Sequence, residues 1–284
     1  MNKKIKELFN QISIDNKDAS LDEKLYEIYI QIREREDESF EDIRNVILEV
    51  LGINEMDFYT EAVDKNLIKY IEKNIFPQYE KNDKAHGIIH IKEVIRRSFS
   101  LNDTLKLGLA PNMIYAVAAY HDLGKYIDHN THEKIAAAFF IKDEHMKKYF
   151  SEEEQIIIKE AIEDHRSSFE DNPRSSYGKL ISSADRNTRI EIVFIRSFFV
   201  GKTRTPDMTV EEFLDYTFNR LSKRYSEENP ENMFYEDQTY RIFLQDMRNL
   251  LKKEEEFKNR YCEVNHIKSR ENIISEEEGE VNYE

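Results

Sequence analysis

The chain has 284 residues, of which 35% are charged and 39% hydrophobic, and its formal net charge is −15. A chain of this length can bury a sizeable core, and its 7 glycines and 5 prolines are too few for a turn-rich β protein. Proteins that grip nucleic acid by its phosphates usually present a basic face, so the acidic balance argues against DNA or RNA as a partner.

The single cysteine and the lack of long apolar runs indicate the cellular compartment in which we expect the chain. Cys262 alone can form neither an internal disulfide nor a thiolate metal cluster. The N-terminal residues 1–9 carry charges within their apolar stretch, which indicates an amphipathic helix instead of a signal peptide. No apolar run reaches the roughly 18 residues that a membrane span needs. We therefore expect a cytoplasmic protein with no membrane partner.

Helical periodicity runs through the chain from its start. Apolar residues recur at three- and four-residue intervals in segments 25–32 and 43–51, and we expect residues 1–79 to form an N-terminal helical extension. The same period continues in the middle of the chain, where Ser151 and Glu154 have the spacing of a capping box. We find no strand pair and no hairpin signal. The sequence predicts an all-α fold of about ten to twelve helices.

The remaining segments follow in order. Residues 80–201 hold nearly all of the unusual chemistry and are the expected core. Residues 202–268 are expected to form C-terminal helices packed on that core, with a last long helix from about Glu231 to Asn265. Residues 269–284 are polar and acidic and are expected to form a flexible tail.

Histidines are concentrated in the core, where seven of the eight lie between positions 86 and 165. The sharpest signal is His121-Asp122, which ends the apolar segment 113–120 and is followed by Gly124. A helix end beside a glycine lets both side chains turn to one ion, and imidazole with carboxylate suits Fe, Mn, Ni, Zn or Mg. A plainer interpretation is a polar helix end, where the helix dipole favours the imidazole.

Two further motifs flank this pair. They are His-x-x-x-Val at His90 and Ala-Asp-Arg at Asp185, while the pair itself reads His-Asp-x-Gly-Lys. With these motifs in this order, roughly residues 83–188 resemble the HD superfamily of metal-dependent phosphohydrolases. The resemblance implies an all-helical HD-domain bundle that hydrolyses a phosphate ester through a metal-activated water. The implied metal ligands are His90, His121, Asp122 and Asp185.

The resemblance extends to a second pair of histidines. Some HD proteins insert two more histidines between the His-Asp pair and the last Asp and bind two metals, and His132 and His165 occupy such positions. A helical hairpin would bring both to the same side, with Asp122 bridging the ions. His129 competes with His132, because either could reach from a short loop. The implied cofactor is a divalent metal ion (Fe, Mn, Ni, Co, Zn or Mg), one or two per chain.

Cations near these motifs are candidate substrate ligands, because a guanidinium can hold a phosphate through two parallel hydrogen bonds. We expect Asp122 to accept the water proton, and Lys125 and Arg174 to stabilise charge in the transition state. His86 could touch substrate, hydrogen-bond a carboxylate near the metal, or be structural. For each cation a surface salt bridge is the plainer alternative. The candidate substrate-binding residues are His86, Lys125, Arg166, Arg174 and Arg186.

Three functions remain open at this point. The first is a phosphohydrolase acting on a small phosphorylated substrate, such as a phosphate ester or a nucleotide. The second is a di-iron oxygenase, since some HD proteins with six ligands have that activity. The third is a non-catalytic metal-binding sensor or scaffold, in which the flanking helices would serve a partner or a homo-oligomer.

Overall fold

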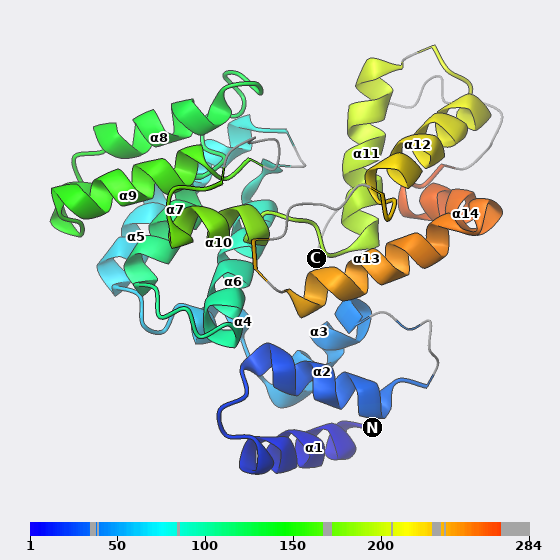
Figure 1. Ribbon diagram of the computed structural model, residues 1–284, viewed down its shortest axis with the longest axis horizontal. Helices are drawn as coiled ribbons and strands as arrows, with labels where there is room; N and C mark the ends of the chain where they lie inside the picture. Colours follow the sequence, from blue (N-terminus) through cyan, green and yellow to red (C-terminus); the bar gives the residue numbers. More distant parts are fainter. Residues whose placement is uncertain are drawn as a thin grey trace. The chain divides into compact units, whose positions relative to one another are not determined.

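The computed structural model describes residues 1–34, 38, 40–83, 86–166, 172–205, 207–228, 234–235 and 237–267. Fourteen α-helices and no strand occur among these residues (Figure 1), which confirms the all-α prediction. None of the described helices is both long and apolar enough to cross a lipid bilayer. The expected tail, residues 269–284, lies outside the described residues.

The chain divides into two compact units. The first comprises Met1–Arg186 and Asn232–Tyr240, and the second comprises Asn187–Glu231 and Arg241–Glu284. The expected boundaries after residues 79 and 201 do not coincide with this division, because the helices before residue 79 have their contacts in the first unit. The first unit holds α1 (Asn2–Asp15), α2 (Leu21–Ile32), α3 (Phe40–Leu51), α4 (Glu55–Tyr59), α5 (Lys65–Asn74), α6 (Ile88–Thr104), α7 (Pro111–Tyr120), α8 (His132–Lys142), α9 (Glu152–Glu163) and α10 (Ser176–Ala184).

Helix α7 forms the centre of the first unit. Every residue from Met113 to Tyr120 is buried, as expected for a helix that is apolar on all sides. Helices α6, α8, α9 and α10 pack against it, and α8 and α9 lie side by side (Figure 1). Ser151 caps α9 in a capping box with Glu154, as the sequence predicts. This arrangement surrounds the C-terminal end of α7 with the ends of other helices.

A buried ion-pair network joins the N-terminal helices to α6. We call its members, Asp22, Arg44, Glu55, Glu93 and Arg96, the Arg44 network. The Arg44 guanidinium is 1% exposed and lies 2.6 Å from Oδ1 of Asp22 and 2.7 Å from Oε2 of Glu55. Arg96 lies 2.6 Å from Glu93 and 3.7 Å from Glu55. Buried charges are tolerated because each one has a partner of opposite sign.

The second unit holds α11 (Ile190–Arg204), α12 (Val210–Arg224), α14 (Glu254–Val264) and most of α13 (Gln238–Leu251). Its core is aromatic, with the ring of Phe194 centred 5.0 Å from Phe257 and 4.9 Å from Tyr261. The prediction of one long helix from Glu231 to Asn265 was wrong, because the helix ends at Leu251 and a new one begins at Glu254. Basic residues 252–253 favour a helix C-terminus and acidic residues 254–256 favour an N-terminus, which accounts for the break.

Candidate metal centre

The His-Asp pair lies where α7 ends. Tyr120 is the last residue of the helix, and His121 and Asp122 follow in a turn. Both residues are fully buried, with 0% of their surface exposed. Gly124 closes this turn with φ +96°, and a Cβ there would lie 2.6 Å from Cγ2 of Ile135. Only glycine therefore combines this backbone conformation with such close packing on α8. The glycine in the motif fixes the direction in which both side chains point.

The two carboxylate oxygens of Asp122 face different imidazoles. Oδ2 lies 3.6 Å from Nε2 of His90 and 3.7 Å from Nε2 of His121. Oδ1 lies 3.1 Å from Nε2 of His132 and 3.5 Å from Nε2 of His165. Asp122 is thus the shared member of two neighbouring groups of nitrogen atoms, as expected for a carboxylate that bridges two ions.

Asp185 completes the group around His90 and His121. It follows the last residue of α10, and its Oδ1 lies 3.0 Å from Nε2 of His90 and 3.8 Å from Nε2 of His121. Three sets of these side chains present ligand atoms within 4.8 Å of one another, a spacing that could hold a metal ion. We call the six residues the His–Asp cluster: His90, His121, Asp122, His132, His165 and Asp185.

Backbone carbonyls fix the orientation of three of the imidazoles. In each case Nδ1 lies within hydrogen-bond distance of the carbonyl oxygen three residues earlier, so Nδ1 must carry the proton. In the neutral form of each ring, the opposite nitrogen, Nε2, then carries the lone pair and faces Asp122, which is the tautomer that a metal ion requires. The pairs are His121 with Ala118 (2.8 Å), His132 with His129 (2.9 Å) and His165 with Ile162 (2.7 Å).

Electrostatics favour ligands that are ready to bind a cation. Burial lowers the pKa of His121 to about 3, so this imidazole is neutral at physiological pH. Burial alone would raise the carboxyl pKa values of Asp122 and Asp185. Neighbouring imidazoles outweigh burial at both residues, with a further contribution from Lys125 at Asp122, and hold both pKa values below their usual range. For His165 burial is outweighed by Asp122, and its pKa is raised.

Two buried nitrogens test whether the cluster suits a metal ion. Among the described residues, Nε2 of His90 and Nε2 of His121 are buried and have no hydrogen-bond partner. Buried polar atoms are rarely left unsatisfied in native proteins, and an ion between these nitrogens and the facing carboxylates would satisfy them. The donor set therefore fits a divalent cation.

Lys125 and His86 lie beside the cluster. The Lys125 ammonium is 3.2 Å from both carboxylate oxygens of Asp122 and 10% exposed. His86 is oriented by Asp83, whose oxygens lie 2.7 and 2.9 Å from its Nδ1. Its ring is centred 6.0 Å from that of His90 and 6.2 Å from that of His129. Both predicted substrate residues are thus within reach of a ligand bound at the cluster.

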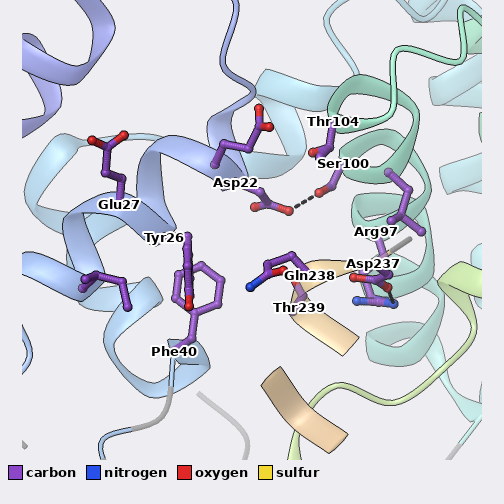
Figure 2. Close-up of a pocket in the computed structure, with 13 residues that line it drawn as sticks. Asp22, Tyr26, Glu27, Phe40, Arg97, Ser100, Thr104, Asp237, Gln238 and Thr239 are labelled. Carbon is purple, nitrogen blue, oxygen red and sulfur yellow. Dashed lines mark hydrogen bonds and ion pairs between the residues drawn. The ribbon is translucent and has the colours of Figure 1, made fainter. Parts of the chain in front are cut away.

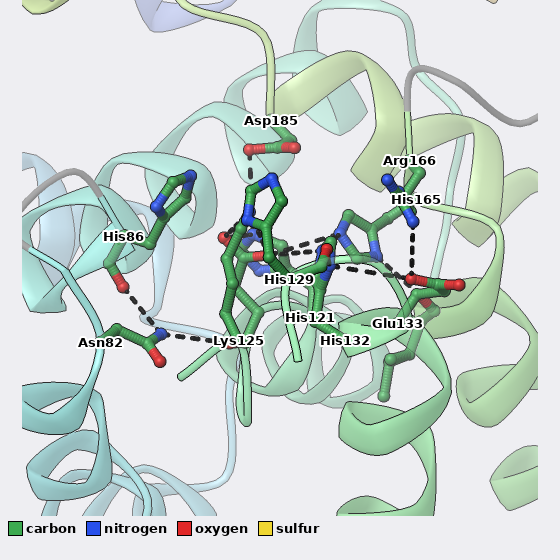
Figure 3. Close-up of polar contacts among 12 residues, drawn as sticks. Asn82, His86, His121, Lys125, His129, His132, Glu133, His165, Arg166 and Asp185 are labelled. Carbon is green, nitrogen blue, oxygen red and sulfur yellow. Dashed lines mark hydrogen bonds and ion pairs between the residues drawn. The ribbon is translucent and has the colours of Figure 1, made fainter. Parts of the chain in front are cut away.

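His129 and His132 compete in the sequence for one ligand position. Nε2 of His132 points at Asp122, while the His129 carbonyl accepts from Nδ1 of His132. Figure 3 shows His121, His132 and His165 together at the cluster. The structure therefore places His132, not His129, among the nitrogens that face Asp122.

The three predicted arginines have other partners. Arg166 donates to the carbonyl of Asn130 and lies 3.3 Å from Glu133. The Arg186 guanidinium lies 5.6 Å from the centre of the Tyr240 ring.

Arg174 is held by acidic side chains. Its Nε lies 3.0 Å from Asp164, its terminal nitrogens lie 2.7 Å from Asp164 and 2.8 Å from Glu163, and its backbone N–H donates to Asp164 at 2.7 Å. These contacts occupy the guanidinium, so the structure does not bring it to the cluster, and its role as a phosphate ligand stays a prediction.

Two supporting residues escaped the sequence analysis. Asp164, which is 0% exposed, accepts hydrogen bonds from the side chain and the backbone N–H of Arg174. Asn82 donates to the carbonyls of His86 and Asp122 at 3.0 and 3.2 Å and accepts from the N–H of Tyr126. Asp164 could have been suspected because it directly precedes a predicted ligand, whereas nothing in the sequence marks Asn82.

Comparison with known proteins agrees with this geometry. A family model described as HD domain matches residues 87–190. An uncharacterized protein of Clostridium beijerinckii is 30% identical over 133 residues, which cover 45% of this chain and 80% of that protein. No solved structure matches the chain. The chain belongs to the HD superfamily of metal-dependent phosphohydrolases.

Proposed function

We propose that this protein is a metal-dependent phosphohydrolase that acts on a small phosphate ester or nucleotide. The observation that carries the proposal is the position of Asp122, whose two carboxylate oxygens each face a separate pair of imidazole nitrogens. This arrangement suits two divalent ions bridged by one carboxylate. The superfamily to which the chain belongs supplies the reaction class.

In the proposed mechanism the His–Asp cluster would hold the ion or ions. A bound divalent ion supplies a water of lowered pKa and an electrophilic contact for a phosphoryl oxygen. The Nδ1–carbonyl hydrogen bonds keep the imidazole lone pairs directed inward, so the ligands need not reorganise during the reaction. Asp122, already ionised, can accept the proton of the attacking water.

Nearby side chains position the substrate. The Lys125 ammonium contacts Asp122 and therefore lies next to the proposed metal site. When substrate binds, this ammonium would contact a phosphoryl oxygen and stabilise the charge that grows in the transition state. His86, oriented by Asp83, would donate a hydrogen bond to the substrate. With Arg174 held by Asp164, Lys125 is the cation that we expect to contribute most.

The test is phosphate release by protein that has been stripped of metal and reloaded with Mn²⁺, Fe²⁺, Co²⁺ or Ni²⁺. The panel contains nucleotides, dinucleoside polyphosphates and generic phosphate esters. We expect phosphate release by the wild type and none by Asp122→Ala, while Asp215→Asn, which alters a carboxylate in the second unit, retains activity. Saturating metal should also raise the melting temperature of the wild type and leave that of Asp122→Ala unchanged.

A di-iron oxygenase remains the second candidate, because the six-ligand set with a bridging carboxylate also suits two iron ions. Oxygen uptake by iron-loaded protein, with no phosphate released from the panel, would establish it in place of hydrolysis. A protein that binds metal tightly and is inert in both assays would be a sensor or scaffold.

A further inference from the structure

The C-terminal end of α10 is held by a side chain from another helix. The last carbonyls of a helix have no partner within it. The Arg97 guanidinium donates to two of them, from Nε to the carbonyl of Ala184 at 3.0 Å and from Nη2 to that of Ser183 at 3.3 Å. The next residue along the chain is Asp185 of the His–Asp cluster. Arg97 thus fixes the peptide units from which a proposed metal ligand projects.

Arg97 and His90 belong to the same face of α6. They are seven residues apart, close to two full turns, so both side chains point in one direction along the helix. His90 approaches the Asp185 carboxylate at 3.0 Å, while Arg97 holds the backbone that precedes it. Helix α6 therefore contacts this ligand and its support at two points.

A carboxylate from a distant part of the sequence orients Arg97. Oδ2 of Asp237 lies 2.7 Å from Nη2 of Arg97, and the two residues are 4% and 3% exposed. Oδ1 of Asp237 accepts from the backbone N–H of Tyr240 at 3.0 Å, which fixes the carboxylate at the start of α13. The guanidinium is therefore held between two helix ends, with carbonyls on one side and a carboxylate on the other.

Packing does not confine this ion pair on every side. Arg97 and Asp237 line a cavity of about 360 Å³, which Figure 2 shows beside the contact of Asp22 with Ser100. Side chains that border a cavity have fewer atoms to restrain them than side chains in a filled core. Hydrogen bonds therefore determine where the guanidinium lies, and loss of one partner would let it move.

We propose that Arg97, oriented by Asp237, is a positioning residue for the metal ligand Asp185. The proposal rests on the metal site of the proposed function. Arg97 does not touch the ion; it holds the end of α10 at the distance from His90 and His121 at which Asp185 can share an ion with them. This role goes beyond stabilising the fold, because it predicts a defect in one part of the His–Asp cluster.

The test is a titration of stripped protein with Co²⁺, followed by visible absorption and calorimetry. Asp185→Asn identifies the ion that depends on Asp185. We expect Arg97→Met to weaken the binding of that same ion by about 10- to 100-fold, with an absorption spectrum shifted toward that of Asp185→Asn. The contribution of His132 and His165 should be unchanged. Arg97→Lys should restore part of the affinity, and Asp237→Asn should lose less than Arg97→Met.

Arg44→Met is the matched control, because Arg44 is also a buried arginine paired with carboxylates and has none of the α10 contacts described for Arg97. It should lose stability and keep the Co²⁺ affinity and spectrum of the wild type. Unchanged Co²⁺ binding in folded Arg97→Met would overturn the inference. If that variant does not fold, unchanged Co²⁺ binding in both Arg97→Lys and Asp237→Asn would overturn it. A wild type that binds no Co²⁺ would instead refute the metal site itself.

Discussion

The first unit contains two buried polar clusters that are built on opposite plans. In the Arg44 network each guanidinium meets carboxylates of opposite charge, and Arg44 has a partner on each side. In the His–Asp cluster, imidazole nitrogens and carboxylate oxygens converge on one another. Lys125 is the only cationic side chain for which the structure describes a contact with Asp122.

The difference separates a structural cluster from a binding site. A buried group that is already paired gains nothing from a ligand, so the Arg44 network serves the fold. Nitrogen and oxygen atoms that converge on one another are favourable partners for a cation, so the His–Asp cluster could hold a metal ion. Burial alone does not tell the two apart; the directions of the donors and acceptors do.

We expect the largest effect from a substitution that disrupts the Arg44 network and leaves the His–Asp cluster intact. Arg44→Met removes the partner of Asp22 and Glu55, and we expect the free energy of unfolding to fall by about 3–5 kcal/mol. Urea titration measures this fall, and the metal content of the folded variant should equal that of the wild type. A loss of bound metal in the folded variant would show that the clusters are not independent.

The second prediction divides the His–Asp cluster into its two halves. His132→Ala and His90→Ala should each lower the affinity for one ion by roughly 100-fold or more. Removal of a ligand should cost more affinity than removal of a residue that only supports a ligand. Elemental analysis after dialysis should find one ion fewer in each, and both lost in Asp122→Ala. Wild-type metal content in His132→Ala would contradict the two-ion arrangement.

The third prediction concerns acid stability. Burial would raise the pKa of Asp22, but Arg44 and Arg96 outweigh it and hold the pKa at about 2, below the usual 3.8. A depressed carboxyl pKa contributes stability that is complete above the unfolded value and is lost as the pH falls toward the folded value. We expect a loss of about 2 kcal/mol between about pH 4 and pH 2. Urea midpoints of the wild type should fall more steeply over this range than those of Asp22→Asn.

The smallest effect concerns Arg174. The Arg174 side chain is 42% exposed, and Asp164 would keep the backbone N–H of residue 174 as a donor, so Arg174→Ala should lower the free energy of unfolding by about 1–2 kcal/mol. The KM for a phosphate ester should change little, whereas Lys125→Met should impair turnover. A large rise in KM with unchanged stability would restore Arg174 to the role that the sequence predicts.

Local apolar spacing predicts the helical class, whereas the six clustered residues are predicted by the resemblance of their motifs to the HD superfamily. Apolar spacing identifies helices such as α7, and the motif around His121 carries its own turn in Gly124. The structure then brings residues 90, 121, 122, 132, 165 and 185 together within one cluster.

Other features depend on contacts that sequence spacing does not reveal. Arg174 is predicted to bind substrate because a guanidinium can hold a phosphate, but its contacts with Asp164, ten residues earlier, follow no local pattern. The pair of Arg97 and Asp237 spans 140 residues, and no local pattern links them. The break between α13 and α14 was predictable from the change of charge sign at residues 252–256, a signal that periodicity alone overlooks.

The carbonyls that hold the imidazoles have a consequence for how the site fills. Because His121 is neutral and its tautomer is set by Ala118, an ion can enter beside it without expelling a proton. The carbonyls of His129 and Ile162 hold Nδ1 of His132 and His165 in the same way, so a proton and an ion compete for Nε2. Acidification should therefore release bound metal from the His–Asp cluster.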